Sequence, residues 1–312
     1  MDPTGWLWAL FTVGAAASQT ARNALQRSLT ERLGTLGATH VRFLYGLPFG
    51  LLFLAVVTLI FGLDGIEPSW SWLAWTVFGA VSQITATALM LAAMRDRAFI
   101  VAIAYVKTEP VLIAGFGFLF LGEILSGRAL SAIGIATAGV LLMSLPARSG
   151  AASTGSPAAA AGGSMAGQLR PTLLGIGSGA VFALSAVGFR GAILDVGDAP
   201  FYVRSTFTLA SGLAIQTALL TGWLLARDRK VLREILQAWR PSLIAGLAGA
   251  VASQMWFLAF SLQTAAAVRT LGLVEILFAQ AASRKLFAQR TSNRETAGIV
   301  LMVAGLVLLV SS

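Results

Sequence analysis

Long apolar stretches separated by shorter polar segments dominate the hydropathy pattern of this chain. A helix needs about 20 mostly apolar residues to cross the hydrocarbon core of a bilayer. The pattern predicts ten transmembrane helices, with the ranges 4–25, 38–62, 70–94, 98–121, 127–146, 171–194, 201–226, 241–263, 265–288 and 292–311. The fold class is therefore expected to be an all-α membrane protein.

Composition supports this class and excludes several chemistries. The chain is 57% hydrophobic and 11% charged, and its mean hydropathy is +0.80, whereas a soluble globular protein carries about a quarter charged residues. It has no cysteine and one histidine, His40. Disulfides, thiol catalysis, iron–sulfur clusters and a His-rich metal site are thereby excluded, and we expect no cofactor. The first apolar stretch is expected to be a retained helix, because the only charge before it is Asp2 and a signal peptide carries Lys or Arg there.

A low-complexity segment divides the chain into two halves. Residues 147–170 are mostly Ala, Gly and Ser, a composition typical of a flexible linker. The halves are residues 4–146 and 171–312, and each contains five predicted helices.

Positive charge is distributed unevenly among the connections between these helices. The odd-numbered connections hold many cations, from Arg22 to Arg294, whereas the even-numbered connections and both termini hold only Arg128 and Arg190. Cytoplasmic loops of membrane proteins are enriched in Lys and Arg. The pattern predicts a multi-pass protein of the inner or plasma membrane with both termini outside. Orientation thus accounts for the net charge of +9, and no nucleic-acid partner is required.

The two halves resemble each other in sequence. Glu275 lies 166 positions after Glu109, and the same offset relates Arg128 to Arg294 and Gly139 to Gly305. With small shifts in the offset, Arg42 corresponds to Arg204, and Arg22 to Arg190. Because five helices are an odd number, the halves would enter the membrane from opposite sides, which is the inverted repeat of secondary transporters. Glu109 and Glu275 would then share one central cavity near the bilayer midplane.

Two segments carry a family resemblance. They are AAMRDRAFIVAIAYVKTEPVLIAGFGFLFLGEILSGRALSAIGIATAGVLL in the first half and LAFSLQTAAAVRTLGLVEILFAQAASRKLFAQRTSNRETAGIVLMVAGLVLL in the second. With Gly122-Glu123 after the fourth helix and Arg42 early in the second, the chain resembles drug/metabolite transporters with two EamA repeats. The counterparts Ala288-Gln289 and Ile276 (opposite Pro110) depart from strict symmetry. The resemblance implies ten helices, as two inverted five-helix repeats around a cavity, and small-solute transport, commonly export.

The two glutamates are the first candidates for function. A charged side chain at the bilayer centre costs at least about 2.5–3.5 kcal/mol, and burial disfavours the charged form of a carboxyl group. Glu109 and Glu275 are therefore expected to serve in proton coupling or cation binding. The alternative is a structural ion pair with a neighbouring Arg or Lys.

Residues around them complete the predicted site. Pro110 removes a backbone N–H and clashes with the carbonyl of Val106, so it would break the helix beside Glu109, and Gly272 would loosen the partner helix; an ordinary kink is the alternative. Lys107 would pair with another residue or reach an anionic group of the solute, and Arg269 would contact the solute or serve the structure. The remaining candidate site residues are Tyr105, Thr108, Trp256 and Gln254, and Arg42 with Arg204 would form a gate or anchor the helices at the interface.

These features predict a secondary active transporter with alternating access and proton coupling. Its expected partners are the lipid bilayer and a small polar metabolite, exported as an amino acid or related compound. Efflux of lipophilic cations is the alternative, which gains if Lys107 and Arg269 face away from the cavity. No HExxH, GxSxG with a membrane histidine, or Walker A motif is present, so an enzyme is not expected, nor is a scaffold that binds without flux. The solute, transport direction, coupling ion and oligomeric state stay open.

Overall fold

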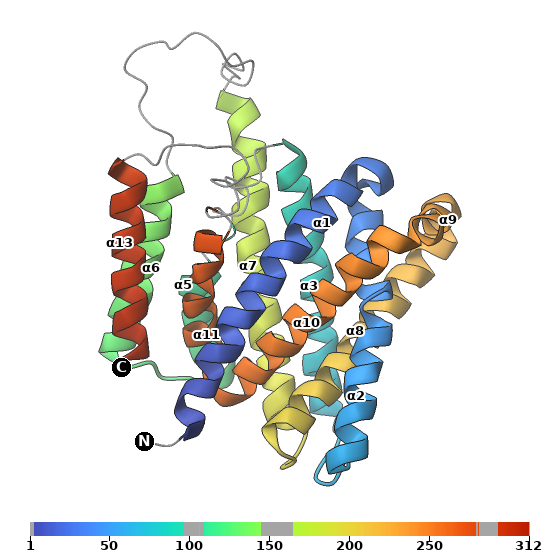
Figure 1. The fold of residues 1–312 in the computed structure, drawn as a ribbon, viewed down its shortest axis with the longest axis horizontal. Helices are drawn as coiled ribbons and strands as arrows, with labels where there is room; N and C mark the ends of the chain where they lie inside the picture. The colour runs from blue at the N-terminus through green and yellow to red at the C-terminus, as the bar shows by residue number, and fades with distance from the viewer. Residues whose placement is uncertain are drawn as a thin grey trace.

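The computed structural model describes residues 3–96, 106, 109–144, 165–278, 280 and 293–311. Within these ranges every regular element is a helix, as Figure 1 shows. The elements are η1 (Pro3–Trp6), α1 (Leu7–Leu44), α2 (Leu47–Phe61), α3 (Trp70–Asp96), α5 (Glu109–Leu121), α6 (Gly127–Ser144), α7 (Met165–Asp195), α8 (Phe201–Arg227), α9 (Arg229–Gln237), α10 (Trp239–Leu262), α11 (Ala265–Leu271), η3 (Gly272–Val274) and α13 (Asn293–Val310).

Helices long and apolar enough to cross a membrane are present in both halves. In the described part of the chain, five continuous helical stretches qualify: Leu7–Phe61, Trp70–Met94, Leu173–Asp195, Phe201–Arg227 and Trp239–Leu262. The first of these contains both α1 and α2. Glu109–Leu121 and Gly127–Met143 are shorter apolar helices. The prediction of an all-helical membrane protein is confirmed at this level.

The connection expected at 26–37 is helical, which corrects the sequence prediction. α1 continues through this segment and leaves helical geometry at Gly34, where φ is 69° and ψ is 177°. A positive φ of this kind is accessible to glycine because it has no Cβ. The Nε2 atom of Gln26 donates a hydrogen bond to the carbonyl of Ala38 across the bend, at 3.0 Å. The polar residues of the segment favoured a loop, but the chain is helical on both sides of Gly34.

A short helix that the hydropathy pattern did not predict lies between α8 and α10. α9 is amphipathic, with Ile235 fully buried and Arg229, Lys230 and Arg233 exposed. The side chain of Asp228 accepts a hydrogen bond from the backbone N–H of Val231 at 3.3 Å, which caps the helix. A single nine-residue helix with one buried face is too short and too charged to appear as an apolar run.

Two further boundaries differ from the predicted ranges. α7 begins at Met165, inside the range predicted as linker. Within the range 98–121, the described residues are 106 and those of α5, and all of them are helical. Within the range 265–288, the α-helix ends at Leu271 and continues as the 3-10 segment η3.

The helices of the two halves pack against each other in pairs (Figure 1). The closest partners are α3 with α7, α1 with α10, α6 with α13, and α2 with α8, and α5 packs against both α7 and α11. α6 and α13 touch through glycines: a Cβ added to Gly139 would lie 2.5 Å from the backbone N of Met302. Small residues of this kind let membrane helices approach closely.

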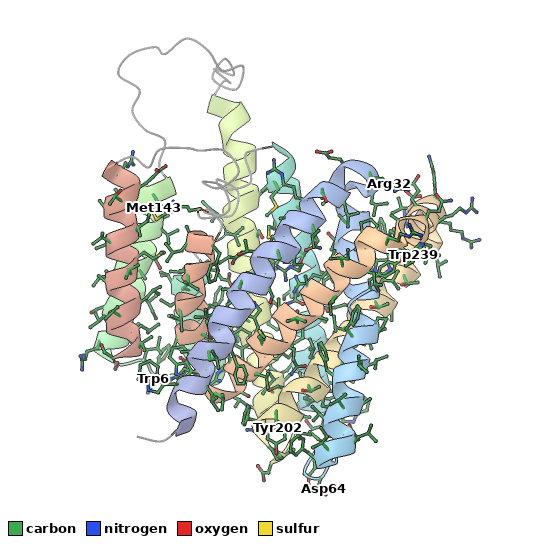
Figure 2. All side chains as sticks on the ribbon, viewed as in Figure 1. Trp6, Arg32, Asp64, Met143, Tyr202 and Trp239 are labelled. Atoms are coloured by element: carbon green, nitrogen blue, oxygen red, sulfur yellow. The ribbon has the colours of Figure 1, made fainter. Side chains whose placement is uncertain are left out.

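The two ends of the bundle carry different charges. Figure 2 shows Arg32 and Trp239 toward the end that holds α9, whereas Asp64 and Tyr202 lie toward the other end. At that second end the connections of the two halves bond to each other, with the N–H of Glu67 donating to the carbonyl of Val196 at 2.8 Å. The start of α1 and the end of α13 lie toward this second end as well (Figure 1).

Candidate functional site

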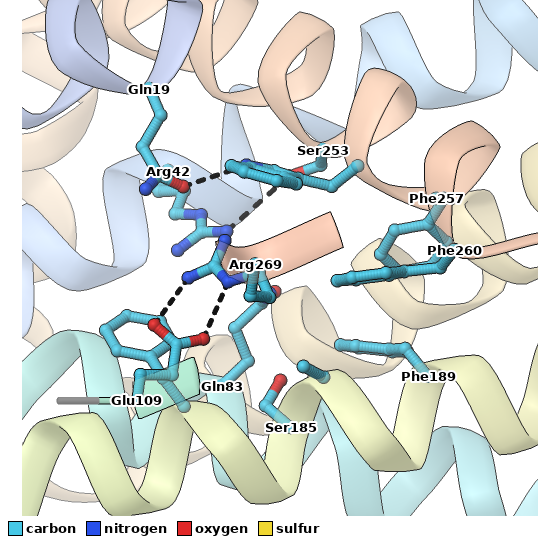
Figure 3. A pocket seen from close by; sticks show the side chains of 13 residues that line it. Gln19, Arg42, Gln83, Glu109, Ser185, Phe189, Ser253, Phe257, Phe260 and Arg269 are labelled. Carbon is cyan, nitrogen blue, oxygen red and sulfur yellow. Dashed lines mark hydrogen bonds and ion pairs between the residues drawn. The ribbon is translucent and has the colours of Figure 1, made fainter. Parts of the chain in front are cut away.

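A cavity between the two halves is lined by the charged side chains of Arg42, Glu109 and Arg269 (Figure 3). Atoms leave about 370 Å³ of it unoccupied, including the part open to solvent. Its lining comes from α1, α3, α5, α7, α10 and α11, and comprises Gln19, Arg42, Gln83, Glu109, Phe182, Ser185, Ala186, Phe189, Ser253, Trp256, Phe257, Phe260 and Arg269. We call this space the central cavity.

Glu109 and Arg269 form a bidentate ion pair in the central cavity. Nε of Arg269 lies 2.7 Å from Oε1 of Glu109, and Nη2 lies 2.7 Å from Oε2. The side chain of Arg269 is 9% exposed and that of Glu109 is 2% exposed. Glu109 begins α5 in the first half and Arg269 lies in α11 of the second half, so the pair joins the two halves. A planar fork against a carboxylate is the strongest geometry for such a pair.

Trp256 holds Arg269 from the opposite side. The guanidinium carbon of Arg269 lies 4.4 Å from the centroid of the Trp256 ring, which is a cation–π contact. The indole N–H of Trp256 donates to Oε1 of Gln19 at 3.0 Å. A Cβ at Gly272 would come within 2.5 Å of the Trp256 ring, so glycine is required for this approach. The start of η3 at Gly272 thus positions Trp256 against the arginine.

Glu275 is fully buried in a second, adjacent pocket. It accepts hydrogen bonds from Nε2 of Gln19 at 2.7 Å and from Nδ2 of Asn23 at 3.0 Å. Of the cavity residues, Gln19, Phe182 and Arg269 also line this second pocket, together with Arg22, Asn23, Met90, Val106 and Glu275. Gln19 bonds to both Trp256 and Glu275, and therefore connects the two glutamate sites.

Arg42 is buried without a carboxylate partner among the described residues. It is 3% exposed, and its Nη1 atom lies 3.0 Å from Oγ1 of Thr87, whereas Nη2 lies 3.5 Å from Oγ of Ser253. Its Nε atom is buried with no hydrogen-bond partner. Figure 3 shows Arg42 beside Arg269 in the central cavity. This burial does not fit the predicted role as an anchor at the membrane interface.

The described charges of the two pockets do not cancel. Arg22, Arg42 and Arg269 face Glu109 and Glu275, and three cations minus two anions leave one positive charge. Arg22 is 1% exposed and bonds to Oδ1 of Asn23, which corrects its assignment to a polar connection. A buried, uncompensated charge is costly in a protein interior.

An aromatic wall closes the other side of the central cavity. Phe189 and Phe257 pack with ring centroids 4.7 Å apart, and Trp256 and Phe260 stack at 6.2 Å. Phe182 also lines the space. The cavity therefore offers charged and apolar surfaces to one occupant. Among the described residues, no group of three or more His, Asp or Glu side chains could hold a metal ion.

Beside the aromatic wall, a second ion pair connects the halves. Arg190 of α7 pairs with Glu123, which follows α5, and donates to the backbone carbonyl of Phe260. It also donates to the carbonyl of Gln263 at 2.7 Å. The pair thus ties the connection after α5 to the end of α10.

The predicted site residues are only partly brought together. Tyr105, Lys107 and Thr108 lie outside the described residues. Gln254 turns away from the cavity, because its Nε2 atom donates to Thr206 of α8 at 2.9 Å. Arg204 also lies elsewhere, near the carbonyl of Gly197 at 3.5 Å.

The sequence prediction missed the polar face of α1. Gln19, Arg22, Asn23 and Gln26 are all buried. Their spacing of i, i+3, i+4 and i+7 places them on one side of a helix. That spacing is the signal in the sequence, but it continues past the end of the apolar stretch, so Arg22 and Gln26 read as loop residues.

Comparison with known proteins finds a family match in the first half of the chain. Residues 6–145 match the model of the EamA-like transporter family, which belongs to the drug/metabolite transporter superfamily. This confirms the family resemblance predicted from the sequence. The comparison with curated proteins gives no match. A solved crystal structure, described only as that of a protein, is similar in fold, with a TM-score of 0.67 and 16% identity over 96% of this chain and 94% of that chain.

Proposed function

We propose that this protein of the EamA-like transporter family is a secondary active transporter for a small polar metabolite. The function supported best is export of an amino acid or related compound by alternating access, with proton coupling. The observation that carries the proposal is the central cavity, whose lining comes from both halves and whose Glu109–Arg269 ion pair spans them. Alternating access requires contacts between two halves that can break and re-form.

An inverted repeat of ten helices is part of the proposal, and the α6–α13 contact supports it. A Cβ at Gly139 would meet residues 298 and 302, whereas one at Gly305 would meet residues 132 and 136. Each of these numbers differs from its counterpart by the repeat offset of 166. A two-fold axis exchanges the two partners of a contact and reproduces the same contact, as observed here.

The packing partners extend the same symmetry over the bundle. If α1 corresponds to α7 and α3 to α10, exchanging the halves turns the α3–α7 contact into the α10–α1 contact, and both are observed. The α2–α8 and α5–α11 contacts map onto themselves. This agreement supports two inverted units, with the arginine-rich end that holds α9 in the cytoplasm.

The two glutamates differ in their surroundings, which supports separate roles. Glu109 is neutralised by Arg269, whereas Glu275 is held by the amides Gln19 and Asn23. Arg269 lines both pockets. If Arg269 changed its ion-pair partner, the protonation of one glutamate would therefore affect the other. We propose Glu275 as the proton-coupling residue and Glu109 as the residue that holds Arg269.

A polar solute with an anionic group fits the cavity better than a lipophilic cation. Arg269 lines the central cavity together with Arg42, against the single carboxylate of Glu109. A cationic drug would face this positive surplus without a free carboxylate of the cavity to bind it. Since EamA proteins form a transporter family, transport is favoured over catalysis.

Flux in proteoliposomes tests the proposal. Vesicles with the purified protein are loaded with a mixture of labelled amino acids, and release is followed with and without a pH gradient; the lipophilic cation tetraphenylphosphonium is the comparison. We expect amino-acid release that depends on the gradient and a loss of that dependence in Glu275→Gln. Glu67→Gln, at an exposed side chain, is the matched control. Equal gradient dependence in the wild type and Glu275→Gln would contradict the coupling role.

A further inference from the structure

We infer that Arg42, with Ser253, forms a subsite for a carboxylate group of the transported solute. The inference rests on the proposed function and deepens it, because it identifies the part of the solute that is recognised. The cationic residues expected to meet an anion from the sequence were Lys107 and Arg269, whereas Arg42 was expected at a gate or at the interface. The geometry points to Arg42 for three reasons.

The first reason is that Arg269 is already occupied. Two of its nitrogens bond to both oxygens of Glu109, and its face packs on Trp256. A carboxylate that bound Arg269 would have to displace a buried bidentate pair. Arg42 has no such partner among the described residues, and it lines the same cavity.

The second reason is the hydrogen-bonding state of Arg42 and its neighbours. The hydroxyl of Thr87 donates to the carbonyl of Gln83 at 2.8 Å, so it serves Arg42 only as an acceptor. Oγ of Ser253 lies 3.5 Å from Nη2, at the limit of a hydrogen bond, and has no acceptor of its own among the described residues. The Nε atom of Arg42 also lacks a partner. These donors match the two oxygens of a carboxylate.

The third reason is the charge balance. The described residues of the two pockets leave a surplus of one positive charge, and a carboxylate with a single negative charge would offset it locally at Arg42. A phosphate monoester, which carries close to two negative charges at neutral pH, would reverse the imbalance. The aromatic rings of Phe189 and Phe257 line the same cavity and give it an apolar side. Glu109 is not free for an ammonium group, so affinity is expected to follow the carboxylate and not the amine.

A series of matched ligands tests this on the wild-type protein. Binding to detergent-purified protein is measured by calorimetry for phenylalanine, leucine and alanine, for the amines that lack the carboxylate, and for the acids that lack the amine. For at least one of the three side chains, the dissociation constants of the amino acid and of the acid are expected to lie within about tenfold of each other. The corresponding amine is expected to bind at least about tenfold more weakly than either. Equal or tighter binding of the amines, competition by chloride alone, or binding of none of these compounds would each overturn the inference.

Variants then assign the effect to Arg42. We expect Arg42→Gln to weaken binding of the acids by at least about tenfold, and Arg42→Lys to recover part of it, while the amines change little. Ser253→Ala should weaken the acids by a smaller factor and provides the test if Arg42→Gln does not fold. Arg240→Gln, at an exposed arginine, is the control. Unchanged acid binding in Arg42→Gln or Ser253→Ala would overturn the assignment.

Loss of the carboxylate subsite and loss of the transport function are distinguishable. A protein that transports amino acids with no preference for the carboxylate keeps the proposed function and loses the subsite. A protein that binds the acids through Arg42 but supports no flux of any solute keeps the subsite and loses the transport function.

Discussion

Glu109 and Arg269 pair through two hydrogen bonds of 2.7 Å each, although 160 positions separate them in the sequence. The pair connects α5 of the first half to α11 of the second. It therefore has two functions in our account. It neutralises two charges in the apolar core, and it holds the halves together on one side of the central cavity.

Removal of one partner of this pair is expected to destabilise the protein more than removal of both. Glu109→Gln or Arg269→Gln leaves a buried charge without its partner, at a cost of about 3–5 kcal/mol. The double variant leaves two neutral amides, so its loss should be smaller than the sum of the single losses. Apparent melting temperatures in detergent give the comparison. Additive losses would show that the two side chains do not interact.

Gln19 should matter more than Gln254, a partly buried glutamine that does not line the central cavity. Gln19→Met removes the bonds to both Trp256 and Glu275, and a buried polar group left unsatisfied costs about 1–3 kcal/mol. We expect a lower melting temperature and weaker amino-acid binding. Gln254→Met is the control, since its amide bonds to Thr206 outside the cavity; its binding should stay near the wild-type value. Equal loss of binding in both variants would contradict this role of Gln19.

Apolar runs predicted the span-forming helices because lipid requires them, and α3, α8 and α10 begin and end within two residues of the predicted ranges. The same signal failed wherever polar residues lie inside a helix. Arg22 and Gln26 read as loop because they are charged or polar, yet they are buried on α1. The partner of Glu109 could not be predicted either, since Lys107 and Arg269 were both candidate cations and only the fold brings Arg269 to Glu109. Arg42 was expected at a gate or at the interface because a new helix was predicted to start at 38, which would place Arg42 in its first turns. In the structure Arg42 lies in the last turn of α1 instead.

The glycine contact between α6 and α13 predicts a position-dependent effect of alanine. Gly139→Ala would place a methyl group 2.5 Å from the backbone of α13, and overpacking of this kind costs about 1–3 kcal/mol. Gly134→Ala lies on the same helix with no atom within 4 Å of the added Cβ, so it should be neutral or slightly stabilising. Melting temperatures of both variants check this. The reciprocal variant Gly305→Ala should match Gly139→Ala, and a large difference between these two would argue against the two-fold relation.

The absence of cysteine from the chain allows single cysteines to report orientation without background. Asp64→Cys and Lys230→Cys lie on exposed side chains of opposite ends. A membrane-impermeant maleimide added to intact cells should label Asp64→Cys and leave Lys230→Cys unmodified until the cells are opened. The opposite pattern would reverse the proposed orientation.

The most direct test of alternating access is the reactivity of one cysteine in the central cavity from each side of the membrane. Ser185→Cys is conservative in size, and Ser185 lines the cavity from α7. The impermeant thiol reagent is applied to sealed right-side-out and inside-out vesicles, with the exposed variants Asp64→Cys and Lys230→Cys reporting the side. We predict that Ser185→Cys reacts from both sides and that a transported amino acid changes both rates. Reaction from one side only, with or without solute, would contradict an alternating cavity.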